Sequence, residues 1–175
     1  ISQGQVRAMV IDRDNFLWVG ALDGLIYYDI DKGRVVRKFT QLDDRLKGNH
    51  ISALFIDSED RVWIGHSGKG ITLVEDGEFV ELNLGFDFTP RCFVEDQDGF
   101  IWVGTEGRGV IRYNVTSKRV IRMYSVEDGG LMANLINQVA VDSFNNIYVG
   151  TNKGLDVFFS EAGRFYSYTA SSGFV

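Results

Sequence analysis

Several short segments of this chain contain residues that bind ions in other proteins. The segment DQDG, from Asp96 to Gly99, resembles the start of a calcium-binding loop. Such a loop also needs an acidic ligand at its twelfth position, where this chain has Gly107. Aspartate and glycine both favour tight turns, so we predict that the segment is a turn between two strands. The same interpretation applies to the acidic segments DRDN and DSED, which begin at Asp12 and Asp57.

A second segment, GTEGRG at residues 104–109, has the composition of a phosphate-binding loop. Such loops open a helix, because the amide groups at the helix N-terminus hold the anion. Here strand-forming residues follow the segment, so the sequence predicts no phosphate site.

The residue types that most often carry catalysis or bind transition metals are scarce. The chain has two histidines, His50 and His66, and one cysteine, Cys92, and their spacing fits no zinc motif. No G-x-S-x-G nucleophile motif occurs. We expect Cys92 to be a buried, unreactive thiol. The sequence therefore predicts no catalytic residue, no metal site and no cofactor.

The composition disfavours several further classes of protein. The 175 residues carry a formal net charge of −6, which opposes non-specific binding to nucleic acid. No stretch approaches the roughly 20 apolar residues that a membrane-spanning helix needs. Glycine occurs 20 times and proline once, which indicates many tight turns.

The candidate residues belong to a unit that the chain repeats four times. An aromatic residue followed two positions later by glycine occurs in FLWVG, RVWIG, FIWVG and NIYVG, at spacings of 45, 39 and 46 residues. An aspartate precedes each aromatic residue by six positions. The aspartates are Asp12, Asp57, Asp96 and Asp142, the aromatic residues are Trp18, Trp63, Trp102 and Tyr148, and the glycines are Gly20, Gly65, Gly104 and Gly150.

Each repeat is expected to form four short antiparallel strands. In the first repeat, the segments VRAMVI, FLWVG, LIYYD and RVVRKFT are separated by turns rich in aspartate, asparagine and glycine. Consecutive apolar residues indicate strands that are buried on both faces of the sheet. Units of four strands that recur about every 40 to 45 residues are typical of β-propeller blades. We therefore predict an all-β fold of four four-stranded antiparallel blades.

The predicted repeats are approximately residues 1–45, 46–84, 85–130 and 131–175, which together form one propeller segment. We expect the aromatic residue on each second strand to fill the gap between neighbouring blades. The glycine two positions later is expected to end that strand where a side chain would obstruct the turn.

The repeat resembles that of the two-component regulator propeller family. DQDGFIWVGTEGRGVIRYN, residues 96–114, is close to the family pattern, and EDGGLMANLINQVAVD, residues 127–142, is similar to its junction between blades. The resemblance covers essentially the whole chain. It is looser in the second repeat, which has IGHSGKG, and in the fourth, where Tyr148 replaces tryptophan.

This resemblance implies a periplasmic ectodomain of a hybrid sensor kinase or related regulator, similar to those of Bacteroidetes. Such ectodomains often respond to oligosaccharides. They usually contain seven-bladed propellers, followed by a membrane span and signalling domains that are absent from this sequence. We therefore expect a segment of a larger, seven-bladed ring, attached to the membrane only through the parent protein. A complete four-bladed ring and a half that associates with a second copy are the alternatives.

Candidate ligand-binding residues lie where the repeats differ from one another. Turns between second and third strands, and junctions between repeats, open on one face of a propeller, where ligands often bind. Aromatic rings beside charged groups suit a sugar. The alternative is that these are solvated loop residues, or that the phenylalanines pack under their own loop. The candidates are His66, Lys69, Phe86, Phe88, Arg91, Glu106, Arg108 and Lys153.

Three functions remain open from the sequence. The first is a ligand-sensing or structural segment of a two-component sensor, without enzymatic activity of its own. The second is a scaffold for protein contacts that has no small-molecule site. The third, a propeller lyase or hydrolase, would need catalytic residues from several blades that converge on the axis, and the sequence shows no such cluster.

Overall fold

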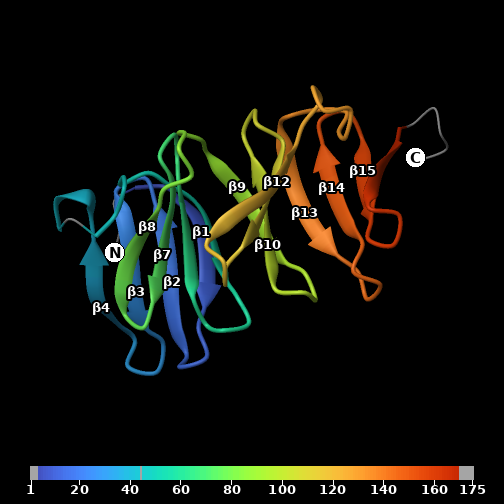
Figure 1. Ribbon diagram of the computed structural model, residues 1–175. Helices are drawn as coiled ribbons and strands as arrows, with labels where there is room; N and C mark the ends of the chain where they lie inside the picture. The colour runs from blue at the N-terminus through green and yellow to red at the C-terminus, as the bar shows by residue number, and fades with distance from the viewer. Residues whose placement is uncertain (1–3, 44, 170–175) are drawn as a thin grey trace. The chain divides into compact units, whose positions relative to one another are not determined.

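The computed structural model describes residues 4–43 and 45–169. Among them, sixteen strands form four antiparallel four-stranded sheets, each made of strands that are consecutive in the chain (Figure 1). The predicted all-β fold of four-stranded antiparallel blades is confirmed.

The blades follow one another along the chain. Blade 1 contains β1 (Val6–Ile11), β2 (Phe16–Ala21), β3 (Gly24–Asp29) and β4 (Arg34–Phe39), and a 3-10 turn, η1 (Gln41–Asp43), follows it. Blade 2 contains β5 (Ile51–Ile56), β6 (Val62–His66), β7 (Gly70–Glu75) and β8 (Glu78–Leu82). Blade 3 contains β9 (Pro90–Glu95), β10 (Phe100–Thr105), β11 (Val110–Asn114) and β12 (Arg119–Tyr124). Blade 4 contains β13 (Ile136–Val141), β14 (Ile147–Thr151), β15 (Leu155–Phe159) and β16 (Arg164–Tyr168).

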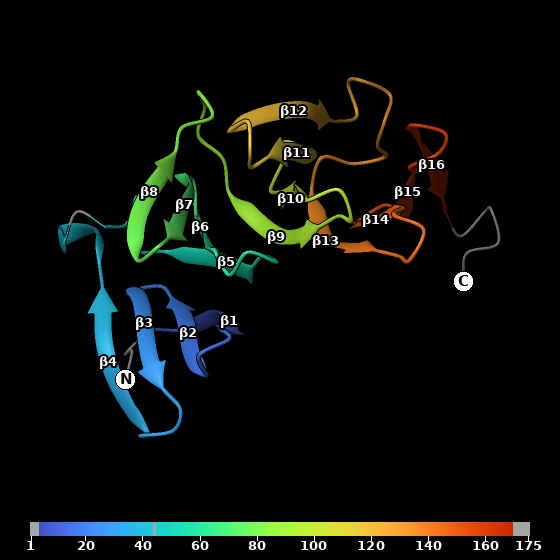
Figure 2. The same ribbon diagram turned by 60° about the horizontal axis from the view of Figure 1, so that its bottom comes forward.

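The chain divides into two compact units, Ile1–Pro90 and Arg91–Val175, which we call unit 1 and unit 2. Unit 1 holds blades 1 and 2, and unit 2 holds blades 3 and 4 apart from the first residue of β9. Within unit 1, β5 lies against β1 and β2, and within unit 2, β13 lies against β10 (Figure 2). The organisation of all four repeats as one propeller segment stays a prediction.

Each unit has its own apolar core, centred on a tryptophan of a second strand. In unit 1, Trp18 packs in a cluster with Leu25, Phe39 and Ile51. In unit 2, Trp102 packs in a cluster that includes Tyr124, Ile136 and Phe158. These residues come from both blades of each unit, so the expected filling of the gap between blades is observed at Trp18 and Trp102.

The turn from the first to the second strand has the same backbone conformation in all four blades. The residue three positions after the aspartate has a positive φ: 63° at Asn15, 65° at Asp60, 76° at Gly99 and 64° at Asn145. Asparagine, aspartate and glycine tolerate this left-handed region better than other residues. This explains why the chain uses these three residue types there.

The glycines at the end of the second strands have a different role from the one predicted. The backbone φ of Gly20 and Gly104 is not positive, so neither glycine is required by the conformation of a turn. A Cβ on Gly20 would lie 2.4 Å from Ile51 Cγ2, and a Cβ on Gly104 would lie 2.6 Å from Ile136 Cγ2. Ile51 and Ile136 begin the first strand of the next blade. The glycines therefore allow that strand to approach closely.

No helix among the described residues is long and apolar enough to cross a membrane.

The close approach of blades makes a test of the glycine role possible. We expect Gly104→Ala to lower the free energy of unfolding by about 1–3 kcal/mol, because the added methyl group overpacks the contact with Ile136 and Cys92. In Gly150→Ala, the nearest described atom would be 3.7 Å from the new Cβ, so a change below about 0.5 kcal/mol is expected. Urea denaturation of both variants measures the difference, and equal effects would contradict the role.

Candidate functional site

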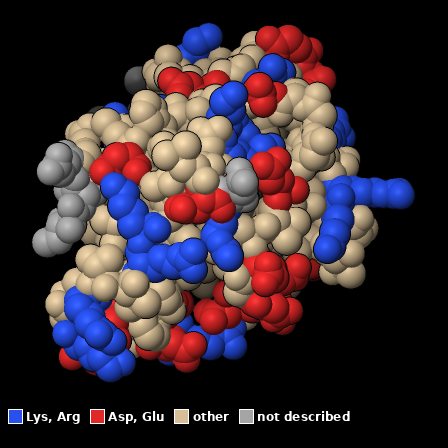
Figure 3. All heavy atoms as spheres, turned by 90° about the vertical axis from the view of Figure 1, so that its left-hand side faces the viewer, with Lys and Arg blue, Asp and Glu red and all other residues tan. Residues whose placement is uncertain are grey.

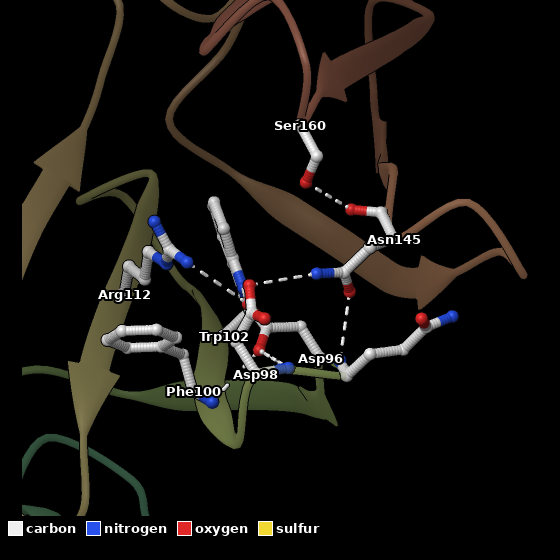
Figure 4. A network of polar contacts seen from close by, with 8 residues as sticks. Asp96, Asp98, Phe100, Trp102, Arg112, Asn145 and Ser160 are labelled. Carbon is white, nitrogen blue, oxygen red and sulfur yellow. Dashed lines mark hydrogen bonds and ion pairs between the residues drawn. The ribbon is translucent and has the colours of Figure 1, made fainter.

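The aspartate after each first strand connects the following turn to the second strand. In blade 3, Asp96 Oδ1 accepts hydrogen bonds from the amides of Asp98, at 3.0 Å, and Phe100, at 2.9 Å. Its other oxygen, Oδ2, accepts a hydrogen bond of 2.7 Å from the indole Nε1 of Trp102 (Figure 4). Both oxygens of this buried carboxylate are therefore used by the fold.

The other three blades repeat this arrangement, which we call the aspartate clasp. Indole Nε1 donates to the carboxylate at 2.8 Å in both the Trp18–Asp12 and the Trp63–Asp57 pair. In blade 4, the hydroxyl of Tyr148 donates to Asp142 Oδ2 at 3.0 Å. Tyrosine therefore preserves the donor as well as the ring. The pKa of Tyr148 is raised above its ordinary value, chiefly by the hydrogen bond that its hydroxyl donates to this carboxylate.

Two of the clasps also contain an arginine. Arg61 Nε lies 2.7 Å from Asp57 Oδ2, and Arg112 Nη2 lies 3.4 Å from Asp96 Oδ2. The Arg112 guanidinium also lies over the Phe100 ring, at 4.0 Å from its centroid. The carboxylates of Asp57 and Asp96 are therefore already paired with an arginine and with hydrogen-bond donors of the fold. Among the described residues, no group of three or more histidine, cysteine, aspartate or glutamate side chains could hold a metal ion.

Hydrogen bonds also join the clasp turns of the two blades within each unit. In unit 2, Asn145 Nδ2 donates to Asp98 Oδ2 at 3.1 Å, and Asn145 Oδ1 accepts from the backbone amide of Gln97 at 2.9 Å. The backbone carbonyl of Asn145 accepts a hydrogen bond from Ser160 Oγ in the same blade (Figure 4). In unit 1, the equivalent turns are joined by the ion pair Arg13–Asp60, at 3.0 Å. The positions correspond, but the chemistry is an amide bridge in one unit and a charge pair in the other.

At the opposite end of the strands, the structure buries His66. We expected this residue on an exposed rim, and that placement is wrong, because His66 is the last residue of β6 and has no exposed surface. Its Nδ1 lies 2.7 Å from the Gly48 carbonyl, and its Nε2 lies 2.9 Å from Thr72 Oγ1. Burial lowers the pKa of His66 to about 4. The ring joins the junction before blade 2 to β7 and presents no atom to solvent.

The segment before blade 3 packs on the same turn. Phe88 is buried, its ring lies against Gly70, and its carbonyl accepts a hydrogen bond from the Gly70 amide at 2.8 Å. The rings of Phe86 and Phe88 are 5.5 Å apart. The structure therefore favours the alternative that these phenylalanines pack under their own loop. Of the four candidates in unit 1, Lys69 is exposed.

The four candidates in unit 2 are exposed. Glu106 and Arg108 lie on either side of Gly107 in the turn between β10 and β11. This turn is held by the Asn134 carbonyl, which accepts from the amides of Gly107 and Gly109 at 3.0 and 2.9 Å. The other two candidates, Lys153 and Arg91, lie in the turn between β14 and β15 and on β9.

Cys92 is buried beside Gly104, as expected for an unreactive thiol. Burial raises its pKa to about 11. The thiol is therefore protonated near neutral pH, which disfavours nucleophilic chemistry.

Sequence reasoning did not identify a groove between blades 1 and 2 in unit 1, with a volume of about 750 Å³. The turns β1–β2, β5–β6 and β7–β8 line one part of it, and these turns lie at the opposite end of the strands from the β6–β7 turn. Four aromatic rings line it, together with four arginines. The rings are Trp18, Tyr27, Phe39 and Phe79, and the arginines are Arg13, Arg37, Arg45 and Arg61.

Burial of the neutral imidazole of His66 makes stability depend on pH. In the unfolded chain the imidazole of His66 binds a proton near pH 6.5, but in the folded chain it does so only near pH 4. The stability that the buried neutral imidazole contributes is therefore fully present above pH 6.5. As the pH falls from 6.5 to 4, this contribution to the free energy of unfolding decreases by about 3 kcal/mol. We expect His66→Gln to lose this part of the difference in unfolding free energy between pH 7 and pH 4.

Urea denaturation at both pH values measures this difference. His50→Gln is the matched control, because His50 is exposed, and it should keep the wild-type pH dependence. A His66→Gln protein with unchanged pH dependence would contradict the role of burial.

The chain is similar to known proteins in both sequence and structure. The family model "Two component regulator propeller" matches residues 45–68 and 84–107. Histidine kinase P4 of Formosa agariphila is 25% identical over an alignment that covers 77% of this chain and 11% of that protein. The chain thus spans about a tenth of this curated relative.

Solved structures share the fold. The extracellular domain of the putative hybrid two component system BT3049 from B. thetaiotaomicron has a TM-score of 0.86 at 23% identity, covering 97% of this chain and 24% of that one. For the putative hybrid system BT4673 the TM-score is 0.80 at 22% identity, covering 94% and 22%. Virginiamycin B lyase from Staphylococcus aureus has a TM-score of 0.72 at 13% identity, covering 96% and 56%.

At these identities the structural likeness establishes the fold of propeller blades, which both sensor ectodomains and a lyase use. The family is indicated by the sequence segments that match its model, and these include the clasp residues Asp57, Trp63, Asp96 and Trp102. Residues 45–68 and 84–107 therefore match two-component regulator propeller repeats, the family that the sequence pattern indicated.

Proposed function

We propose that this chain is a ligand-sensing segment of the extracytoplasmic, periplasmic ectodomain of a two-component sensor, and that the sensor responds to an oligosaccharide. The observation that carries the proposal is the match of its repeats to the two-component regulator propeller model. The segment binds and does not catalyse. The kinase activity belongs to the parent protein, which would be a hybrid sensor histidine kinase.

The proteins that resemble the chain support this assignment. One is named a histidine kinase, and two are extracellular domains of putative hybrid two component systems. The chain spans about a quarter or less of each, so the ligand, the output and the membrane attachment belong to the proposal.

Each unit has its own exposed rim, and the rim residues of each unit provide the proposed oligosaccharide contacts. Lys69 in unit 1, and Arg91, Glu106, Arg108 and Lys153 in unit 2, offer charged donors and acceptors for sugar hydroxyl groups. His66 and Phe88 would act indirectly, by holding the turns that carry such residues. A ligand changes signalling only if it binds one conformation of the ectodomain more tightly than the other.

We also propose that further blades are the partners of blade 4. Gly20 and Gly104 are each covered by the isoleucine that begins the next blade, whereas a Cβ on Gly150 would meet no described atom closer than 3.7 Å. On β15 and β16 of the same blade, Phe159 and Tyr168 line two hollows of about 650 and 200 Å³. In the longer parent polypeptide, Gly150→Ala should therefore be as destabilising as Gly104→Ala, and a harmless substitution there would contradict this partner.

The sensing proposal predicts that one class of oligosaccharide stabilises the protein. At a ligand concentration of a hundred times the Kd, the free energy of unfolding should rise by about 2.7 kcal/mol. A thermal-shift panel of oligosaccharides, on this chain and on the whole ectodomain, measures the effect. Lys69→Ala and Arg108→Ala should reduce the shift, and Val80→Ala, at an exposed position on β8, should not. No shift with either protein would contradict the proposal.

A further inference from the structure

The groove between blades 1 and 2 exists because blade 2 differs from the other blades at one position. The third strand carries an aromatic residue opposite the residue that precedes the clasp ring: Tyr28 faces Leu17, Tyr113 faces Ile101, and Phe158 faces Ile147. In blade 2 the residue at this position is Val74, which faces Val62. Valine is much smaller than an aromatic ring, so blade 2 leaves a space there.

Unit 2 shows what fills the equivalent space. The Phe158 ring lies 5.2 Å from the rings of both Trp102 and Phe165, and 5.6 Å from that of Tyr124, so four rings pack together. In unit 1, the equivalents of the other three rings are Trp18, Phe39 and Phe79, and Val74 stands in place of the fourth. The groove is therefore lined by a ring cluster that lacks one member.

The lining offers apolar faces together with hydrogen-bonding groups of both kinds. The Tyr27 ring centroid lies 4.6 Å from that of Phe16 and 4.5 Å from that of Trp18. Burial, followed by the charges of Asp12 and Asp14 and a hydrogen bond to Asp12, raises the pKa of Tyr27 to about 12. The guanidinium of Arg37 lies over Phe39, at 5.1 Å. Arg45 lies over Phe79 in the same way, at 5.6 Å.

Charges of both signs line the groove, with six carboxylates and four guanidinium groups. A strongly charged ligand of either sign would meet like charges there. Figure 3, which views the molecule from the side of β4, shows acidic and basic side chains interspersed with uncharged ones. A neutral molecule with many hydroxyl groups can accept from the guanidinium groups and donate to the carboxylates, while its C–H face rests on the rings.

We propose that the groove between blades 1 and 2 is a binding site for a small neutral saccharide, separate from the rim. The volume of the groove is within the range of about 300–1,000 Å³ that is usual for small-molecule sites. The site does not require the chain to be a sensor. It would add a second point of saccharide recognition at the other end of the blades.

The indole signals of the three tryptophans provide a direct test on the 175-residue chain. Trp18 lines the groove, whereas Trp63 and Trp102 are fully buried. The ¹⁵N-labelled protein is titrated with glucose, galactose, mannose, xylose and their β-linked disaccharides. At least one of them should shift the Trp18 indole signal saturably and leave the other two in place, and Trp18→Phe assigns that signal. If none of these sugars moves it, the proposal is overturned.

A substitution that copies unit 2 gives the second arm of the test. Val74→Phe restores the ring that Phe158 supplies in blade 4, so it should fill the groove and weaken saccharide binding at least tenfold. Binding that is undiminished in this folded variant would overturn the proposal. If Val74→Phe does not fold, Phe79→Ala, at the half-buried edge of the groove, replaces it and should weaken binding similarly.

Rim variants separate this site from the proposed sensing site. Lys69→Ala and Arg108→Ala should leave the Trp18 titration unchanged. If saccharides shift the amide signals of Lys69 and Arg108 but never the Trp18 indole, the groove proposal fails and the sensing proposal stands. If the Trp18 indole moves and the rim signals do not, the groove proposal stands alone.

Discussion

The fold depends on one carboxylate in each blade, which is buried in blades 2 and 3 and half-buried in blades 1 and 4. In blade 3, Asp96 Oδ1 closes the turn between the first two strands through two backbone amides, and Asp96 Oδ2 accepts a hydrogen bond from the Trp102 ring in the core. A hydrogen bond to a charged group contributes about 1.5–3 kcal/mol, and a buried donor left without its partner costs a comparable amount. Turn and core are therefore stabilised together. The six-residue spacing of aspartate and aromatic residue follows from this geometry.

The packing of blade on blade builds on the position of that ring. Once the clasp fixes the second strand, a glycine two residues later leaves room for the isoleucine that begins the next blade, as Gly20 does for Ile51. Apolar residues of both blades then share one core in each unit, around Trp18 in unit 1 and around Trp102 in unit 2. The units nevertheless differ where the blades meet: Phe158 completes a ring cluster in unit 2, and Val74 leaves a groove in unit 1. The repeats thus keep the scaffold constant and vary the surface between blades.

The sequence predicted the strands, the turns and the repeat because these depend on local patterns of residue types. It did not reveal that each aspartate binds its aromatic residue, although the constant spacing and the replacement of tryptophan by Tyr148 in the last blade were both visible. It placed His66 on the rim because it assigned the residue to the variable turn between the second and third strands, whereas the structure puts it at the end of β6. Its burial there depends on the hydrogen-bond partners Gly48 and Thr72. The groove was missed because it results from a small residue, Val74, and a search of the sequence for chemistry looks for reactive ones.

The most direct measurement of the clasp is hydrogen exchange of the tryptophan indole protons under native conditions. If the carboxylate holds each ring, the indole protons of Trp63 and Trp102 should exchange as slowly as the backbone amides of β6 and β10, and Asp96→Asn should accelerate exchange at Trp102 far more than at Trp63. Indole protons that exchange much faster than those amides, or an Asp96→Asn protein with unchanged protection at Trp102, would contradict the account.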